Sequence, residues 1–417
     1  MLFRSGSDTC GSIRIPSSVN NLVGLRPTKG LSSIAGIVPL STTQDVGGPL
    51  ARSVADLAVM LDATIGEDPA DPATKLPAGQ TRPKFAEALG GASLKGARIG
   101  ILEPLFGDAA DDQEVIRIVR GSIDELKKEG ATAVPVPMPE LTAALDGSSV
   151  INSEFKEDLA KYLAGSGNPP VHSLEEIVRG GLYHAALGGV LNLRVASKGR
   201  DSREYQIAMA KRTAIQQMML KLMEDQKLDA LLYPTLRRKP ARVGDPQGGS
   251  TCQLSASTGF PAISMPAGFT ADGLPVGAEL LGREWEDAKL VGYAYAYEQA
   301  THHRRAPGRT PALTSVAALS WVVEGERGVT GKFRLDPTTN ELAYQVTAAG
   351  DVLSASIHRA AKGENGPAVW VLANRGFPKI EGSVTLSDPD RERLMSGGLY
   401  LRVGFRAGEV RLAMQAK

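Results

Sequence analysis

Cysteine is the scarcest residue type in this chain. Only Cys10 and Cys252 occur among 417 residues, too few for a framework of several disulfides. A single bridge between the two is left open, and neither possibility assigns the chain to a compartment. Histidine is also rare, with five residues, and aromatic residues make up only 5% of the chain.

Excess charge and long apolar runs are absent as well. The net charge is +1, from 47 basic and 46 acidic residues, so we expect no nucleic-acid partner. No run reaches the ~18 apolar residues of a membrane span, so no such span is expected. Residues 1–5 lack the apolar segment of a secretory signal peptide.

Glycine, by contrast, is abundant. The chain has 46 glycines in 417 residues, about 11% where ~7% is usual. The apolar fraction of 42% and the charged fraction of 22% are typical of a globular protein. The length allows two or three domains. These numbers favour a loop-rich fold with tight backbone turns over a helical bundle.

A glycine- and serine-rich stretch stands at the start of the chain, over residues 6–17 with the sequence G-S-D-T-C-G-S-I-R-I-P-S. Small residues let successive backbone N–H groups turn toward one point and form an anion-binding nest. A serine in such a loop can attack a carbonyl carbon while the amides bind the oxyanion. The alternative is an ordinary Gly/Ser/Asp turn.

Two further motifs follow in order: V-G-L-R-P-T-K-G at residues 23–30 and G-G-P-L-A-R-S-V at residues 47–54. Together with the first loop they resemble the amidase signature family, whose pattern runs close to G-T-D-x-G-G-S-I-R-x-P, G-L-K-P-T and G-P-x-A-R-S-V. Similar segments lie at residues 258–269 and 273–282, and a helical A-x-x-Y-E-Q arrangement lies at residues 294–299. The resemblance runs from residue 6 to about residue 306.

The pattern of apolar residues between these motifs predicts α/β structure. A strand at residues 97–102, a helix at 111–129 closed by Gly130 and a strand at 131–136 indicate a βαβ unit. We expect a helix beginning at Ser53 and ended by Gly66, mostly helical structure over residues 139–227, a strand at 228–235, and a hairpin turning at Asp272-Gly273. The resemblance implies a mixed twisted sheet flanked by helices, truncated at its N-terminus.

The composition and the pattern of apolar residues change after residue 306. Residues 307–316 are rich in Pro and Gly and are expected to form a linker. Short alternating segments separated by turns then predict an all-β sandwich or barrel over residues 317–417. This part resembles the CHRD (chordin-type) domain through L-D-P at 335–337, I-H at 357–358, G-E-N-G-P at 363–367 and G-L-Y at 398–400. The expected domains are therefore 1–306 and 317–417.

The resemblance to the amidase signature family implies a chemistry. Its members use a Ser–cis-Ser–Lys relay, which implies Ser12 as the nucleophile and the backbone amides of Thr9, Cys10, Gly11 and Ser12 as the oxyanion hole. Asp8 and Arg14 are expected to hold this loop rather than to react. Cys10 stands where the family usually has glycine; a nucleophilic role for its thiol is an alternative that no nearby histidine supports.

The family's lysine and middle serine lie upstream of this loop. No lysine precedes Lys29, and Ser5 and Ser7 are too close to Ser12 to match the spacing. We therefore expect a truncated or mis-started chain that is inactive or weak as it stands, because losing one member of such a unit costs about 10⁶ in rate.

The predicted function is that of an amidase, which hydrolyses the C–N bond of a small-molecule carboxylic amide through a serine acyl-enzyme. No cofactor and no metal are expected, since His358 lacks the second histidine that CHRD domains often have near Val403-Gly404-Phe405. The alternatives are the A subunit of a tRNA-dependent amidotransferase and a non-catalytic binding protein that acts through the CHRD-like domain. CHRD domains favour an extracytoplasmic location; no oligomeric state follows from the sequence.

Overall fold

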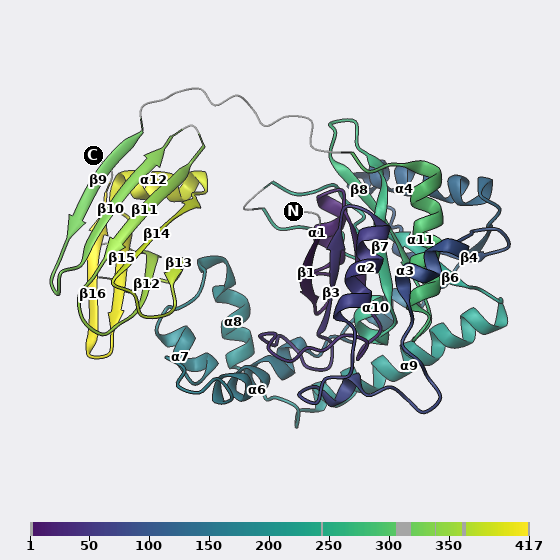
Figure 1. The fold of residues 1–417 in the computed structure, drawn as a ribbon, viewed down its shortest axis with the longest axis horizontal. Coiled ribbons are helices and arrows are strands. Elements are labelled where there is room, and N and C mark those ends of the chain that lie inside the picture. The colour runs from purple at the N-terminus through teal and green to yellow at the C-terminus, as the bar shows by residue number, and fades with distance from the viewer. Residues whose placement is uncertain (1–2, 243–244, 306–317, 338, 361–363, 416–417) are drawn as a thin grey trace. The chain divides into compact units, whose positions relative to one another are not determined.

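The computed structural model describes residues 3–242, 245–305, 318–337, 339–360 and 364–415. The chain divides into two compact units, one made of residues 1–158 and 198–308 and the other of residues 159–197 and 309–417 (Figure 1). The expected linker, residues 307–316, lies outside the described residues.

The first unit is built on an eight-stranded mixed sheet with the strand order β1-β3-β2-β7-β8-β6-β4-β5. The strands are β1 (Phe3–Asp8), β2 (Val23–Arg26), β3 (Val46–Ala51), β4 (Arg98–Leu102), β5 (Thr132–Val136), β6 (Ala230–Pro234), β7 (Ala262–Phe269) and β8 (Pro275–Leu281). Strand β4 runs parallel to β5 and β6, and the other neighbours are antiparallel. The expected mixed sheet is confirmed.

Helices pack around this sheet. They are α1 (Arg14–Val19), α2 (Val54–Thr64), α3 (Phe85–Ala88), α4 (Gln113–Lys128), α5 (Leu141–Leu145), α9 (Arg203–Asp225), α10 (Gln253–Thr258) and α11 (Asp287–Thr301), with α6 (Ile151–Ala164) running from this unit into the second. The Ser53 hydroxyl caps α2 by accepting the N–H of Asp56. Helix α2 ends at Thr64 with Ile65 as its C-cap, so Gly66 directly follows the cap as expected, although its φ is not positive.

The βαβ unit forms as expected, with β4 and β5 parallel and α4 between them. The apolar side chains of α4 recur at helical spacing and are buried: Val115, Ile116, Val119, Ile123 and Leu126. Gly130, with φ of +90°, turns the chain out of the helix toward β5. The hairpin of β7 and β8 also forms, with Gly273 at φ +81° in its turn.

Small residues on one face of the sheet let α1 lie directly on the strands. Gly24 in β2 pairs with Ser264 in β7. A Cβ on Gly24 would overlap the Ser17 hydroxyl of α1, and a Cβ on Gly277 would lie 2.6 Å from the Ser18 hydroxyl. This close approach fixes α1 and therefore the loop that precedes it.

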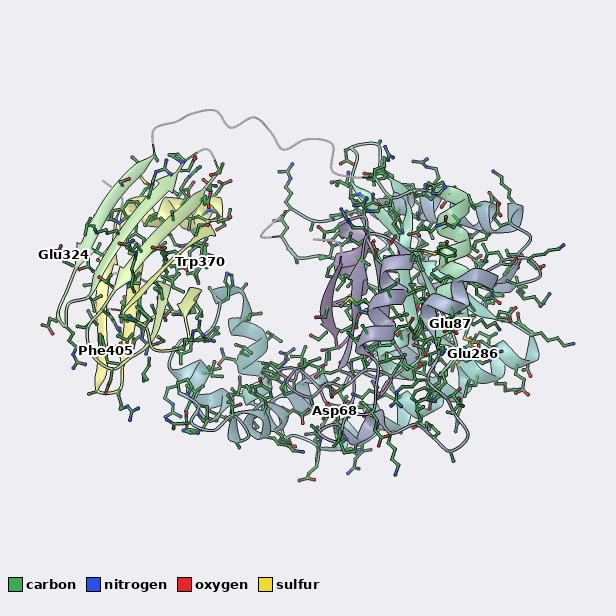
Figure 2. The ribbon with its side chains drawn as sticks, in the orientation of Figure 1. Asp68, Glu87, Glu286, Glu324, Trp370 and Phe405 are labelled. Atoms are coloured by element: carbon green, nitrogen blue, oxygen red, sulfur yellow. A yellow bond between two sulfur atoms is a disulfide. The ribbon has the colours of Figure 1, made fainter. Side chains whose placement is uncertain are left out.

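The second unit contains two four-stranded antiparallel sheets, β14-β11-β10-β9 and β13-β12-β15-β16. The strands are β9 (Leu319–Glu324), β10 (Thr330–Asp336), β11 (Glu341–Thr347), β12 (Val352–Arg359), β13 (Ala368–Ala373), β14 (Lys379–Thr385), β15 (Leu399–Phe405) and β16 (Gly408–Met414). Apolar side chains of both sheets share one core, to which Phe405 belongs and against which Trp370 packs (Figure 2). The expected all-β sandwich is confirmed, with one added helix, α12 (Asp388–Ser396).

Two helices from the middle of the chain belong to this second unit, α7 (Leu174–Arg179) and α8 (Gly188–Val195). The turn after α7 contacts β13, where the N–H of Ala368 donates to the carbonyl of Gly181 at 2.8 Å. His184 also forms a bridge with Ala368. Among the described residues, no helix is both long enough and apolar enough to cross a membrane.

Candidate active site

Ser12 lies in the loop between the end of β1 and the start of α1, and its side chain is exposed. Within the described part of the chain its hydroxyl makes no hydrogen bond. The loop is therefore held by its backbone and by buried neighbours, not by Ser12 itself.

Four consecutive backbone carbonyls of the loop, those of residues 8–11, each accept a hydrogen bond from another group of the protein. Asp8 O accepts from Arg26 Nη1, Thr9 O from Gln44 Nε2 at 3.0 Å, Cys10 O from Arg14 Nη2 and Gly11 O from the N–H of Ile15 at 2.7 Å. In a planar trans peptide the carbonyl and the following N–H point in opposite directions. The N–H groups of residues 9–12 consequently point away from these donors.

These four N–H groups have no acceptor among the described residues. The next one, of Ile13, does: it donates to Asp8 Oδ2 at 3.2 Å. The unpaired donors thus end at Ser12, beside its exposed hydroxyl. Successive unpaired N–H groups are the structural requirement for binding an oxyanion.

A buried ion cluster lies beneath the loop. The Asp8 carboxylate accepts from Arg14 Nε at 3.2 Å and from Arg26 Nη1 at 3.0 Å, and all three side chains are at most 1% exposed. Burial alone would raise the pKa of Asp8, but the two guanidinium groups hold it below its usual value. Asp8 and Arg14 hold the loop, as expected.

The sequence did not reveal Glu279, which completes this cluster from β8. Its Oε1 accepts from Arg14 Nη1 and from the Tyr233 hydroxyl, the latter at 2.8 Å. Burial raises the pKa of Glu279, and its Oε2 has no hydrogen-bond partner within the described residues. A charged residue in the otherwise apolar strand V-G-A-E-L-L was the only signal in the sequence.

Gln44 and Asp45 are a second pair that the sequence did not single out. Beyond holding Thr9 O, Gln44 accepts the N–H of Val150 through Oε1 at 2.8 Å, so it joins the loop to the start of α6. Asp45 Oδ1 accepts the Thr9 hydroxyl at 2.5 Å.

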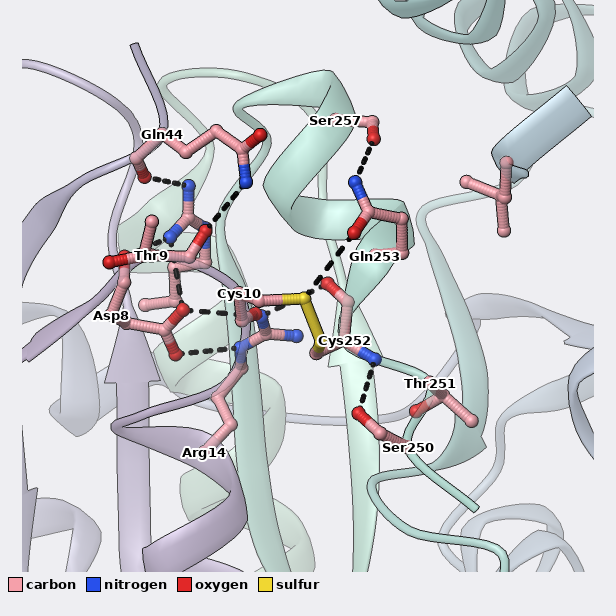
Figure 3. Close-up of a disulfide and its surroundings, with 12 residues drawn as sticks. Asp8, Thr9, Cys10, Arg14, Gln44, Ser250, Thr251, Cys252, Gln253 and Ser257 are labelled. Carbon is pink, nitrogen blue, oxygen red and sulfur yellow. Dashed lines mark hydrogen bonds and ion pairs between the residues drawn. A yellow bond between two sulfur atoms is a disulfide. The ribbon is translucent and has the colours of Figure 1, made fainter. Parts of the chain in front are cut away.

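The two cysteines are joined by a disulfide, which ties the loop to the start of α10 (Figure 3). Cys10 therefore has no free thiol, which excludes the alternative that it is a nucleophile in this state. Its φ is not positive, so the usual glycine of the family is not required here by backbone conformation. Glycine is required next to it, because a Cβ on Gly11 would lie 2.9 Å from Cys252 Cβ.

A cavity of about 290 Å³ lies beside Cys252. Its lining mixes apolar and polar side chains: Pro104, Leu105, Thr142, Leu145, Asp146, Arg237, Ser250, Thr251 and Gln253. Gln253 also donates to the Ser257 hydroxyl at 2.8 Å (Figure 3). The cavity is large enough for a small organic group.

Lys29, the first lysine of the chain, donates hydrogen bonds to two backbone carbonyls. Its Nζ donates to Thr42 O at 2.8 Å and to Asp45 O at 2.6 Å, and burial lowers its pKa to about 8. Within the part of the chain that the structure describes, it makes no hydrogen bond to Ser12.

His358 has a structural environment in the second unit. Its Nδ1 donates to Gly366 O at 2.7 Å, so Nε2 accepts the Ser356 hydroxyl at 2.8 Å, and the ring stacks on Tyr400. Burial lowers the pKa of His358. Across the described residues no cluster of three or more His, Cys, Asp or Glu side chains could hold a metal ion.

Comparison with known protein families identifies two successive regions of the chain. The Amidase family model matches residues 1–291, and the CHRD domain model matches residues 312–411. The chain is 33% identical over 326 residues to the A subunit of the glutamyl-tRNA(Gln) amidotransferase of Synechococcus sp. (strain JA-2-3B'a(2-13)), covering 74% of this chain and 62% of that protein. It is 32% identical to a probable amidase of Arabidopsis thaliana, covering 72% of this chain and 57% of that protein.

Among solved structures, the native peptide amidase from Stenotrophomonas maltophilia superposes with a TM-score of 0.64 at 33% identity, covering 73% of this chain and 63% of that chain. The chain thus spans about three fifths of the length of these relatives. The matched residues include the loop, the buried cluster and the disulfide-bonded residues described above. The chain belongs to the amidase family, and a CHRD domain follows the amidase region.

Proposed function

We propose that this chain provides the nucleophile and the oxyanion hole of an amidase that cleaves a carboxylic amide C–N bond. One observation supports this most directly: the exposed Ser12 hydroxyl lies beside four backbone N–H groups, of residues 9–12, that are unpaired within the described residues. The buried cluster of Asp8, Arg14 and Arg26 keeps these donors in place before substrate binds.

The proposed reaction proceeds in two stages. Ser12 Oγ attacks the amide carbonyl carbon, and the loop N–H groups bind the oxygen as it becomes negative. The C–N bond then breaks, the amine leaves with a proton, and water hydrolyses the resulting ester on Ser12. Each well-aligned oxyanion donor contributes about 2.7–4 kcal/mol in the transition state.

A serine hydroxyl needs a base to become a good nucleophile. The described residues place no lysine or histidine against Ser12, and Lys29 donates to two carbonyls instead. We therefore propose that this 417-residue polypeptide has little activity unless a lysine and a second serine reach Ser12 from outside it.

The proposed substrate is a small-molecule amide rather than a nucleic acid. One structural relative is named a peptide amidase, and the cavity of about 290 Å³ beside Cys252 would accept a group of small-molecule size. The second candidate is a component of a tRNA-dependent amidotransferase, which the name of the Synechococcus relative favours. Hydrolysis of glutamine in preference to simple aliphatic amides would favour that second candidate.

The test is covalent labelling of Ser12 with a fluorophosphonate, read by mass spectrometry. We expect slow labelling of the 417-residue chain and none for Ser12→Ala. A chain extended upstream with the lysine and middle serine of a relative should label at least about 100-fold faster, well within the ~10⁶ that such a unit can supply. Ser7→Ala, which removes another exposed serine of the same segment, is the matched control and should label normally.

Two outcomes would contradict the proposal. Labelling that persists in Ser12→Ala would assign the nucleophile to another residue. Fast labelling of the 417-residue chain itself would show that it already contains a working base.

A further inference from the structure

The only two cysteines of the sequence are joined across the loop that holds Ser12. Cys10 lies between two of the N–H donors proposed for the oxyanion hole, and Cys252 immediately precedes α10. The bond therefore connects the donors to the wall of the cavity that Thr251 and Gln253 line.

Arg14 makes a second, noncovalent connection between the same two residues. Its Nη2 donates to the carbonyl of Cys10 and, at 3.3 Å, to the carbonyl of Cys252. Gln44 holds the preceding carbonyl, of Thr9, at 3.0 Å. Without the disulfide, the peptide groups on both sides of Cys10 would depend on these hydrogen bonds alone.

The bond is placed where a small reductant can reach it. Both cysteines are partly exposed, in contrast to the fully buried ion cluster beneath them. Cys10 Sγ lies 3.5 Å from Gln253 Oε1. After reduction the Cys10 thiol would have this oxygen as an acceptor, so the reduced form also has a defined partner.

We propose that the Cys10–Cys252 disulfide is a reducible positioning element for the oxyanion loop, and that its reduction loosens the loop and slows acyl transfer to Ser12. This inference rests on the proposed function. In the oxidised state the covalent bond, Arg14 and Gln44 together fix the N–H groups of Cys10 and Gly11. In the reduced state only the hydrogen bonds remain, and the donors lose their fixed direction.

The reductant is a dithiol. One thiolate attacks a sulfur of the bridge, breaks the S–S bond and releases one cysteine thiolate; the second thiol then displaces the other cysteine and closes a disulfide in the reductant. Two electrons pass from the dithiol to the protein, and Cys10 and Cys252 each end as a protonated thiol.

The first experiment measures order in the loop without relying on activity. The full chain is compared before and after dithiothreitol by residue-resolved amide hydrogen exchange, with the redox state checked by alkylation and mass spectrometry. The amides of Ile13 and Ile15, bonded to Asp8 Oδ2 and Gly11 O, report the loop. We expect at least ten-fold faster exchange of both on reduction, while Leu57 in α2 is unchanged.

Matched variants separate the bond from side effects of the reagent. Cys252→Ala should show fast exchange at Ile13 and Ile15 with and without dithiothreitol. The double variant Cys10→Gly/Cys252→Ala should show no response to the reagent. Exchange at Ile13 and Ile15 that is the same in the oxidised and reduced proteins would overturn the proposal.

The second experiment measures fluorophosphonate labelling of Ser12 in both redox states of the chain extended upstream with the lysine and middle serine of a relative. We expect the maximal rate to fall at least ten-fold on reduction, with the half-saturating concentration within two-fold, and to recover on reoxidation. Equal labelling rates in the two states would overturn the positioning role even if exchange differs. Absence of labelling in both states counts against the proposed function, while the exchange result still decides whether the bond orders the loop.

Discussion

At the scale of single residues, Asp287 shows how the second motif is held. Its carboxylate accepts the N–H of Thr28 at 2.8 Å and the hydroxyl of Thr28 at 2.5 Å. The side chain is 1% exposed, and burial raises its pKa to about 6 from 3.8. Thr28 and Glu284 are the neighbours that most affect this pKa, and neither is a cation, so ionising Asp287 is costly in the folded protein.

We predict that this carboxyl makes stability depend on pH. Because the folded pKa lies above the unfolded one, the stabilisation is complete below about pH 4 and is lost as the pH rises through about 6. The loss amounts to about 3 kcal/mol, at 1.36 kcal/mol per pKa unit. Urea unfolding of the wild type and Asp287→Asn from pH 4 to 7 checks this, since asparagine keeps an acceptor for Thr28 but cannot ionise.

The expected result is a free energy of unfolding that falls less steeply with pH in Asp287→Asn than in the wild type. Parallel curves for the two proteins would contradict the assignment.

The sequence singled out candidate residues that are adjacent in the chain and did not single out distant residues that contact the same loop. Asp8, Ser12 and Arg14 could be singled out because they lie in one contiguous motif, residues 6–17. Glu279 and Gln44 reach the same loop from distant strands and turns. No local pattern encodes which buried charge will meet Arg14, so these partners required the fold.

At the scale of elements, the seating of α1 on the sheet determines where the loop lies. Gly24 provides the space, because a Cβ there would overlap the Ser17 hydroxyl. Gly121 in α4 offers a contrast, since a Cβ there would meet nothing within 4 Å and its φ is not positive.

We therefore predict opposite effects for the same substitution. Gly24→Ala should destabilise the protein by about 1–3 kcal/mol, the usual cost of overpacking. Gly121→Ala should stabilise it by about 0.5–1 kcal/mol, because alanine is the better helix former. Denaturant unfolding of both variants measures the difference, and a stability loss of equal size in the two would show that the contact with α1 is unimportant.

Helices and strands whose apolar residues recur at a regular spacing could be predicted from the sequence, and elements without such a spacing could not. The spacing of Val115, Val119 and Ile123 predicted α4 from the sequence, because the apolar residues of a buried helix face recur every three to four residues. Helix α12 has only Leu394 as a buried apolar side chain, so no period indicated it. Strand β9 alternates through Leu319, Trp321 and Val323 and lies inside the all-β region expected over residues 317–417.

At the scale of the whole molecule, the two units do not follow the order of the sequence. Residues 159–197 lie inside the amidase match but pack with the CHRD-like strands. Gly181, at φ +64°, lies against the CHRD-like part, where a Cβ would come 2.8 Å from Gly366 O. The boundaries of the sequence motifs could not predict that residues 159–197 pack with the CHRD-like strands. These boundaries show where similarity to a family ends, and they do not show which segments are in contact.

We predict that this contact holds the two matched regions together after the chain is cut. With a protease site inserted between residues 305 and 318, the two fragments should co-elute in size-exclusion chromatography. Gly181→Ala should release the C-terminal fragment, because it adds a clash to the cost of about 1–2 kcal/mol for a left-handed alanine. Gly167→Ala is the control, with φ +77° and nothing within 4 Å of its Cβ.

Equal release by Gly181→Ala and Gly167→Ala would assign the effect to backbone strain and not to the contact.

The sequence positions of the two disulfide-bonded cysteines determine when the bond can form during synthesis of the chain. Its cysteines are separated by 242 residues, so during synthesis Cys10 waits for Cys252 for roughly 12–50 s at ~5–20 residues per second. Between residues 10 and 252 the sequence contains no other cysteine with which Cys10 could pair during that interval. Within these 417 residues no earlier intramolecular bond is available to Cys10, so covalent dimers are an expected error of rapid oxidation, and the loop of residues 6–17 is tied to α10 only after residue 252 has been made.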